Sequence, residues 1–227
     1  MGLLANTTTC QFPVSAADLL RNAEVVFWDF DGVIKDSVEV KAEAFEKLFL
    51  PYGKEIASRV RGHHEAHGGM SRYEKIPIYL KLAGEPVTEE RIREFCRQFS
   101  GLAMQAVIDA PWVPGVQEYL RKNCTKQKFI LTTATPEAEI RQILEAVELT
   151  HCFHEIYGAP TSKVTAIQKV LESQGGALGK ALMVGDSESD WEAAVANGVA
   201  FLLRRTSLNQ LVQARYTGPM FSDLNYE

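Results

Sequence analysis

Short apolar runs recur along the chain and predict the strands of a β-sheet. Several are apolar at successive positions rather than at alternate ones, which is typical of strands buried on both faces. Such strands occur in parallel sheets that are covered by helices on both sides. The predicted strands are residues 25–30, 129–133, 153–158, 181–185 and 199–203.

Helical patterns lie between the later strands, at residues 136–147, 163–172 and 191–197. Thr135 can serve as the N-cap of the first helix, with Pro136 in its first position. Strands that alternate with helices predict a parallel sheet with right-handed crossovers. The apolar face of the first helix is formed by Ile140, Ile143, Leu144 and Val147.

The stretch between the first and second strands differs from the rest of the chain. It has helical periodicity and no convincing strand, and Gly68 and Gly69 are among the residues that break it into helices. We therefore predict a helical domain at residues 38–114. It is inserted into an α/β core made of residues 1–37 and 115–227.

Composition and charge narrow the function classes. The chain has 227 residues, with 24 Lys and Arg against 29 Asp and Glu, and a formal net charge of −5. This balance argues against a general nucleic-acid binder, which usually shows a basic excess. It also gives no reason for attraction to an anionic membrane. In an acidic protein, an anionic substrate would need local groups that attract negative charge at its binding site.

Targeting signals and disulfides are not indicated. The first 22 residues lack the basic start and the apolar segment of a secretory signal, and no apolar run approaches the ~20 residues that span a bilayer. The cysteines are widely spaced, so we expect free thiols and a cytoplasmic protein. They are Cys10, Cys96, Cys124 and Cys152.

Acidic residues follow two of the predicted strands. Asp29 and Asp31 stand two positions apart, so in extended chain they face the same side, ~7 Å apart. Carboxylates this close repel each other unless a cation or a shared proton intervenes. Mg²⁺ prefers such oxygen ligands. The fourth predicted strand ends in Gly185 and Asp186, with Asp190 shortly after. Ligands of parallel α/β sheets bind at these strand ends.

Two further segments have features of an anion-binding site. The second strand runs into Thr132 and Thr133, just before a helix whose free N–H groups could bind an anion. Lys163 falls in the first turn of a predicted helix, where a cation opposes the helix dipole. Its placement therefore favours an anionic partner. Each feature alone also fits a helix cap or a solvated side chain.

Other constellations are weaker. The cluster His63, His64 and His67 resembles a metal site but lacks the H-E-x-x-H spacing, so we expect a solvated helix face. Residues 175–180 read GGALGK but precede a strand and lack the full phosphate-loop pattern.

Taken in order, these residues resemble the haloacid dehalogenase superfamily, a group dominated by Mg²⁺-dependent phosphatases. Its first motif, D-x-D-G-[TV], is matched by DFDGV at residues 29–33. Its second motif is matched by Thr133, with Thr132 as the alternative register, and its third by Lys163. Its fourth, G-D-x-x-x-D, is matched by Gly185, Asp186 and Asp190. The resemblance implies a Rossmann-like, five-stranded parallel core. The 38–114 insertion resembles the helical cap of the phosphoglycolate phosphatase and β-phosphoglucomutase-like subfamily.

The resemblance also implies a role for each of these residues. Asp29 would attack the phosphorus atom of a phosphate ester, and Asp31 would act as general acid and then as general base. Mg²⁺ would be held by the Asp29 side chain, the Asp31 carbonyl and Asp186. Asp190 would orient these groups without binding the metal itself. Phosphate oxygens would be held by Thr133, Ala134 and Lys163.

The substrate is less well defined by the sequence. A cap loop of related proteins carries Gly, Ser and Arg, and here Gly69, Ser71 and Arg72 resemble it. Arg72 is therefore the first candidate for contacting the leaving group, through an acidic or second phosphate group on it, and a solvated arginine is the alternative. Mutases of the subfamily carry a His on the first cap helix, where this chain has Lys41. Lys41 is a further candidate for binding an anionic substrate.

These inferences favour a Mg²⁺-dependent phosphatase acting on a small phosphorylated metabolite, such as a sugar phosphate or phosphoglycolate. A phosphosugar mutase is the second hypothesis, weakened by Lys41. A non-enzymatic regulatory protein on the same fold is the third, and it is disfavoured because the expected catalytic residues are present. The sequence indicates no oligomeric state.

Overall fold

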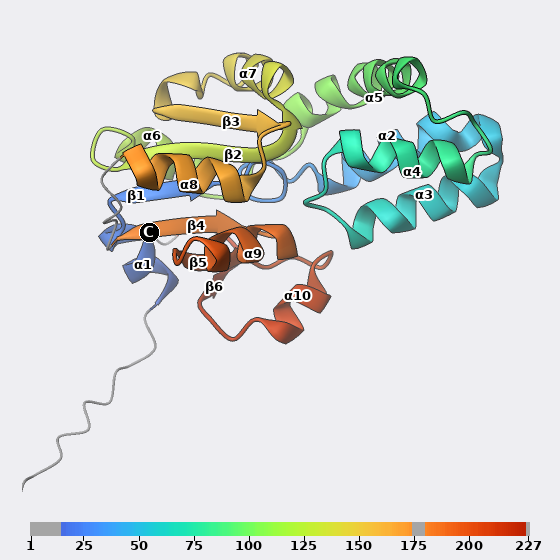
Figure 1. Cartoon of the computed structure of the whole chain (residues 1–227). Coiled ribbons are helices and arrows are strands. Elements are labelled where there is room, and N and C mark those ends of the chain that lie inside the picture. Colours follow the sequence, from blue (N-terminus) through green and yellow to red (C-terminus); the bar gives the residue numbers. More distant parts are fainter. Residues whose placement is uncertain (1–14, 174–179, 226–227) are drawn as a thin grey trace, which may run out of the picture.

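A computed structural model describes residues 15–173 and 180–225 of the chain. Its centre is a six-stranded sheet with the order β3-β2-β1-β4-β5-β6, in which every neighbouring pair is parallel (Figure 1). The parallel sheet and its helices confirm the predicted fold class. The strands are β1 (Val25–Trp28), β2 (Lys128–Pro136), β3 (Glu155–Ala159), β4 (Ala181–Gly185), β5 (Ala200–Arg204) and β6 (Met220–Phe221).

Helices cover both faces of the sheet, because the central strands are apolar at successive positions. Val26 and Trp28 pack on one side, against α1 (Ala16–Asn22), α6 (Val116–Asn123) and α7 (Glu137–Ala146). Val25 and Phe27 pack on the other side, against α8 (Lys163–Ser173) and α9 (Glu188–Ala196). The alternation of a strand thus divides one apolar run between two hydrophobic cores. Short helices η2 (Thr150–Cys152) and α10 (Gln210–Arg215) complete this part.

The chain between β1 and α6 folds into helices, and we call this stretch the insertion. Its helices gather at the end of the sheet toward which the strand arrows point (Figure 1). They bury a hydrophobic cluster of their own, which includes Phe45, Phe49, Tyr79 and Phe99. The helices are α2 (Val38–Phe49), η1 (Leu50–Tyr52), α3 (Lys54–Ala66), α4 (Arg72–Leu82) and α5 (Glu89–Asp109).

The two linkers that join the insertion to the sheet lie side by side. The Asp36 N–H donates to the carbonyl of Pro111 at 2.8 Å, and the Val113 N–H donates to the carbonyl of Ile34 at 3.0 Å. Lys35, which is buried, lies with its Nζ 4.2 Å from the centroid of the Trp112 ring. The chain therefore leaves and re-enters the core at one place.

Three predictions about elements need correction. The sheet has a sixth strand, β6, whose two residues are too few to show a hydropathy pattern. Thr135 is not the N-cap of α7, because β2 continues to Pro136 and Pro136 occupies the cap position. Helix α9 begins at Glu188, before the predicted 191, because Ser187 and Asp190 form a capping box at its start.

Candidate active site

Three carboxylates meet at the carboxyl ends of β1 and β4. Asp29 follows β1, Asp186 follows β4, and Asp190 lies in the first turn of α9. Each offers an oxygen within 4.8 Å of the others, and Asp29 and Asp190 are buried. Parallel strands bring these positions together, as the sequence predicted.

Lys163 is placed among the carboxylates from the start of α8. Its Nζ lies 2.9 Å from Oδ2 of Asp29 and 2.5 Å from Oδ1 of Asp190. Burial acts to lower the pKa of Lys163, but these two carboxylates outweigh it and raise the pKa. Lys163 is thus a buried, charged ammonium beside Asp29, even though its helix dipole disfavours a cation there.

One ammonium leaves the three carboxylates with excess negative charge. Burial, together with Asp190 and Asp31, raises the pKa of Asp29 to about 7, while Lys163 acts against the rise. Burial and the charges of Asp29 and Asp190 also raise the pKa of Asp186 well above its usual value. Because carboxylates crowded in this way favour a bound cation, the donor set fits a divalent metal with oxygen ligands. This set is Asp29, Asp186 and Asp190, and the Asp31 carboxylate is not part of it.

Two glycines allow the carboxylates to pack this closely. A Cβ on Gly32, whose φ is +73°, would lie 2.1 Å from Oδ2 of Asp186. A Cβ on Gly185 would lie 2.2 Å from the Cβ of Asp190. Any larger residue at either position would displace a carboxylate.

The Asp31 carboxylate lies in a separate hydrogen-bond network. Its Oδ1 accepts from Ser37 Oγ at 2.6 Å, and its Oδ2 is 2.5 Å from Lys41 Nζ and accepts from Thr135 Oγ1 at 3.2 Å. Lys41 also donates to Thr135 Oγ1 at 2.8 Å. Burial acts to raise the pKa of Asp31, but Lys41 and the hydrogen bonds outweigh it and lower the pKa. Lys41, predicted to face an anion, therefore faces the carboxylate of Asp31 in this structure.

The two threonines at the end of β2 face opposite sides. Thr132 Oγ1 lies 3.8 Å from Sδ of Met183, on the side of α8 and α9. Thr133 Oγ1 accepts from the N–H of Thr135, at 3.2 Å. This geometry favours Thr133 as the second-motif residue, and its role with phosphate stays a prediction, as does that of the next residue, Ala134.

Sequence reasoning missed two polar groups of the Asp31 network. Ser37 is fully buried, and Thr135 is nearly so. Thr135 could have been recognised from the alternation of β2, because it stands two positions after Thr133 and on the same face. Ser37 carries no comparable signal, since its contact depends on the turn that follows Asp31.

The loop that carries Gly69 and Ser71 lies close to the core. A Cβ on Gly69 would lie 1.7 Å from Oγ of Ser189, so the loop before α4 rests on the first turn of α9. The Ser71 N–H donates to Glu74 at 3.1 Å within its own helix turn. The substrate contacts predicted for Ser71 and Arg72 stay predictions.

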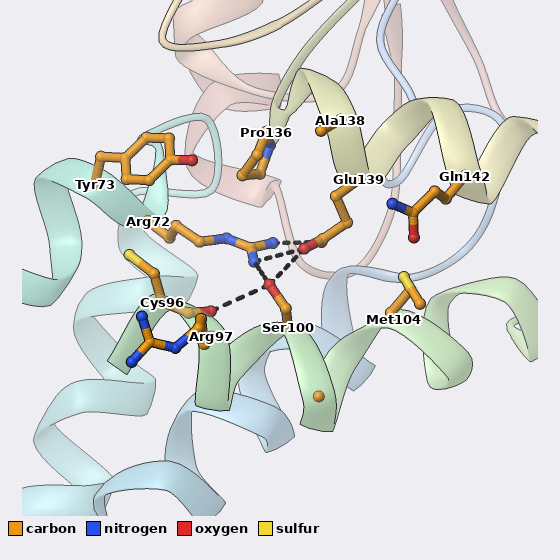
Figure 2. A pocket seen from close by; sticks show the side chains of 11 residues that line it. Arg72, Tyr73, Cys96, Arg97, Ser100, Met104, Pro136, Ala138, Glu139 and Gln142 are labelled. Carbon is orange, nitrogen blue, oxygen red and sulfur yellow. Dashed lines mark hydrogen bonds and ion pairs between the residues drawn. The ribbon is translucent and has the colours of Figure 1, made fainter. Parts of the chain in front are cut away.

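Arg72 has a carboxylate partner from the core. Its Nη1 and Nη2 donate to Glu139 of α7 at 2.8 and 2.6 Å, and Ser100 of α5 donates to the same carboxylate at 2.6 Å (Figure 2). Both charged side chains are buried, beside a cavity of about 390 Å³. The guanidinium is therefore not a solvated arginine, and it joins two insertion helices to the core.

Glu139→Ala is expected to destabilise the protein by about 3–5 kcal/mol, because it leaves the Arg72 guanidinium buried without its carboxylate. The matched control is Glu137→Ala on the same helix, whose exposed pair with Arg141 contributes about 1 kcal/mol or less. Urea unfolding of both variants measures the difference. Equal losses would contradict the assignment of a structural role to the buried pair.

The prediction that the histidine cluster lies on a solvated helix face is wrong for His64. His64 is buried, with Nδ1 2.8 Å from Nζ of Lys75. His63 lies with Nδ1 3.1 Å from the Tyr79 hydroxyl, and His67 is exposed. His64 stands on the same face of α3 as Ala57 and Val60, but helical spacing does not show whether a polar residue on that face is enclosed.

The remaining sequence predictions are tested only in part. Cys96, Cys124 and Cys152 are free thiols, as expected. Cys10 and the phosphate-loop-like residues 175–179 lie outside the described residues, as do the first 14 residues. Among the helices of the described segments, none has the length and apolar character needed to cross a membrane.

The fold and these side chains define an α/β protein with a group of carboxylates where its parallel strands end. A profile of the haloacid dehalogenase-like hydrolases matches residues 26–203, and the chain belongs to this family. The chain is 28% identical over 187 residues to a phosphoglycolate phosphatase from Pseudomonas savastanoi pv. phaseolicola. The match covers 78% of this chain and 67% of that protein.

For two other similar proteins, the match with this chain covers a larger share of their length. A phosphorylated carbohydrates phosphatase from Thermotoga maritima is 27% identical, over 78% of this chain and 82% of that protein. A crystal structure of β-phosphoglucomutase from Clostridium difficile superposes with a TM-score of 0.70 at 18% identity, over 89% of this chain and 92% of that chain. At this identity the likeness shows the shared fold.

Proposed function

We propose that the chain is a Mg²⁺-dependent phosphatase that hydrolyses a small phosphorylated metabolite through an aspartyl-phosphate. The observation that carries the proposal is the placement of Asp29, which lies 2.9 Å from Lys163 and has an oxygen within 4.8 Å of oxygens of Asp186 and Asp190. The names of the similar phosphoglycolate and carbohydrate phosphatases support the same reaction class.

The metal would be held by the Asp29 and Asp186 carboxylates and by the backbone carbonyl of Asp31. Asp190 is already committed to Lys163 and to the Ser187 N–H, at 2.5 and 3.0 Å, so it orders the site rather than completing it. Bound Mg²⁺ would offset the excess negative charge and help to orient the phosphate group.

In the first half-reaction, an Asp29 oxygen attacks phosphorus and the bond between phosphorus and the ester oxygen breaks. Asp31 donates a proton to the departing oxygen. In the second half, water attacks the phosphorus of the aspartyl-phosphate while Asp31 accepts its proton, which releases phosphate and regenerates Asp29. Thr133, the Ala134 N–H and Lys163 hold the phosphoryl oxygens and stabilise their charge.

The Asp31 network suits the second half-reaction as it stands. Lys41 favours the ionised carboxylate, which is the form that accepts a proton. The first half needs a protonated Asp31, which is the form that the contact with Lys41 disfavours.

We also propose the division into a core of residues 1–37 and 115–227 and a cap of residues 38–114. The separate hydrophobic cluster of the insertion and the contact of Gly69 with Ser189 support it. A cap in this position would exclude bulk water during phosphoryl transfer.

The experiment is a screen of phosphorylated metabolites and p-nitrophenyl phosphate with Mg²⁺, in which phosphate release is measured. A phosphatase releases inorganic phosphate from at least one of them. A hexose 1-phosphate that is converted to the 6-phosphate without phosphate release would instead support the mutase. No reaction of any ester would contradict both.

Excess EDTA is expected to reduce turnover by about 10³-fold or more, because the phosphate would then approach uncompensated carboxylates. Titrating Mg²⁺ back should restore the rate. Substantial turnover in EDTA would show that this account of the acidic residues is wrong.

A further inference from the structure

The end of β5 lies next to the carboxylates, although none of the four sequence motifs includes it. The strand order places β4 between β1 and β5, and Leu203 of β5 pairs with Gly185 of β4. Arg204 and Asp186 therefore follow this pair at the same edge of the sheet. Arg204 is only 7% exposed, and a buried guanidinium is costly unless its N–H groups have partners. The partners of Arg204 therefore indicate its role.

Arg204 holds the turn that follows Asp31. Its Nη1 donates to the Gly32 carbonyl and to Oδ1 of Asp36, both at 3.0 Å, and its Nε donates to the Ser222 carbonyl at 3.4 Å. The guanidinium thus reaches from β5 across the end of β4 to the turn after β1. It binds both ends of that turn and fixes its position relative to the sheet.

This turn carries the carbonyl that would bind the metal. The Asp31 carbonyl and the Gly32 N–H belong to one planar peptide unit, and the Gly32 N–H donates to the Lys35 carbonyl at 2.7 Å. A shift of the turn would therefore move the Asp31 carbonyl with it. Asp36, at the far end of the turn, donates its N–H to Pro111 of the second linker, so a movement of the insertion would be transmitted to this turn.

Asn209, at the start of α10, holds the backbone of the other metal ligand. Its Nδ2 donates to the Asp186 carbonyl at 2.7 Å and to the Arg204 carbonyl at 2.8 Å. Its Oδ1 accepts from the Thr206 N–H at 2.9 Å, which fixes the orientation of the amide. One amide therefore connects the backbone of Asp186 to the residue that anchors the turn after Asp31.

We propose that Arg204 and Asn209 are positioning residues for Mg²⁺, which together set the spacing between the Asp31 carbonyl and Asp186. Residues that support metal ligands in this way increase the affinity for the metal without touching it. The spacing matters because Mg²⁺ demands near-ideal octahedral geometry. This proposal rests on the proposed function, since it concerns the metal of the same site.

The experiment titrates Mg²⁺ alone into the full chain and measures binding by isothermal titration calorimetry. Arg204→Met and Asn209→Leu should each bind Mg²⁺ at least about 10-fold more weakly than the wild type. Half-activation of p-nitrophenyl phosphate turnover should need about 10-fold more Mg²⁺, while kcat at saturating Mg²⁺ changes by less than about 3-fold. Arg204→Lys keeps a charged donor and should regain part of the affinity. A residue that only stabilises the fold would leave the Mg²⁺ dependence unchanged.

Arg205→Met is the matched control, because Arg205 is exposed directly after the same strand, donates to Ser222 Oγ and should keep the wild-type affinity. Thermal melting shows which variants are folded. Asn209→Leu changes no charged group, and it decides the test if Arg204→Met does not fold. Wild-type Mg²⁺ affinity in either folded variant would overturn the positioning role alone. A wild type that binds no Mg²⁺ would overturn the proposed metal dependence and the positioning role together.

Discussion

Asp29→Asn is expected to lower phosphate release by about 10⁴-fold or more with every phosphate ester. An amide is a poor nucleophile, so the variant lacks the group that attacks phosphorus in the proposed mechanism. The variant should also fail to form an acid-stable phosphoprotein adduct that the wild type forms transiently. Steady-state kinetics and rapid-quench labelling with radioactive phosphate ester measure the two effects.

The loss should not result from unfolding. The amide introduced by Asp29→Asn keeps an oxygen that can accept from Lys163, and the change removes one charge from three crowded carboxylates. The metal-free variant should therefore melt no lower than the wild type. Asp109→Asn, at an exposed position at the end of α5, is the control and should retain activity. Full activity in Asp29→Asn would eliminate the aspartyl-phosphate mechanism.

Lys163→Met is expected to affect both activity and stability. It removes the ammonium that contacts Asp29 and Asp190, and the loss of one partner from a buried charge pair costs about 3–5 kcal/mol. Catalysis should fall by about 10²–10³-fold, because a positive charge no longer faces the phosphoryl oxygens. Chemical unfolding and kcat/KM are the measurements.

The stability deficit of Lys163→Met should depend on pH. In the wild type the folded-state pKa of Asp29 is already raised to about 7, above its unfolded value, so its contribution to stability falls as pH rises toward 7. Without Lys163 this effect grows, so the deficit should be largest above pH 7 and shrink toward pH 5. Lys169→Met, exposed on the same helix, should show neither the deficit nor its pH dependence. A pH-independent deficit would mean that lost packing, rather than lost charge, is responsible.

The sheet could be predicted because its signal is local. Each central strand is apolar at successive positions, and Val25 to Trp28 indeed divide between two cores. The carboxylates at the ends of β1 and β4 follow from the same logic, since parallel strands end at one edge of the sheet. Strand β6 was missed because two residues have no period.

The contacts of the insertion could not be predicted in the same way. The partner of Arg72 is Glu139, 67 positions away, and the partner of Asp31 in the insertion is Lys41, whose reach depends on how the helices sit on the sheet. His64 and Lys75 look like solvated residues of polar helices, because helical spacing shows which face is apolar and not whether a polar residue is enclosed with it. Such pairings between distant elements exist only after the insertion has docked.

The side-by-side linkers have a consequence for the timing of the proton transfers. The insertion is attached to the sheet through two adjacent linkers, so it can rotate about them. A translation of the insertion would break the hydrogen bonds between Asp36 and Pro111 and between Val113 and Ile34. Asp31 lies before this pivot and Lys41 lies after it, so the gap between them widens as the insertion swings away. Under the proposed mechanism, a rotation that separates Lys41 from Asp31 would raise the proton affinity of that carboxyl group, and the return of the insertion would lower it again.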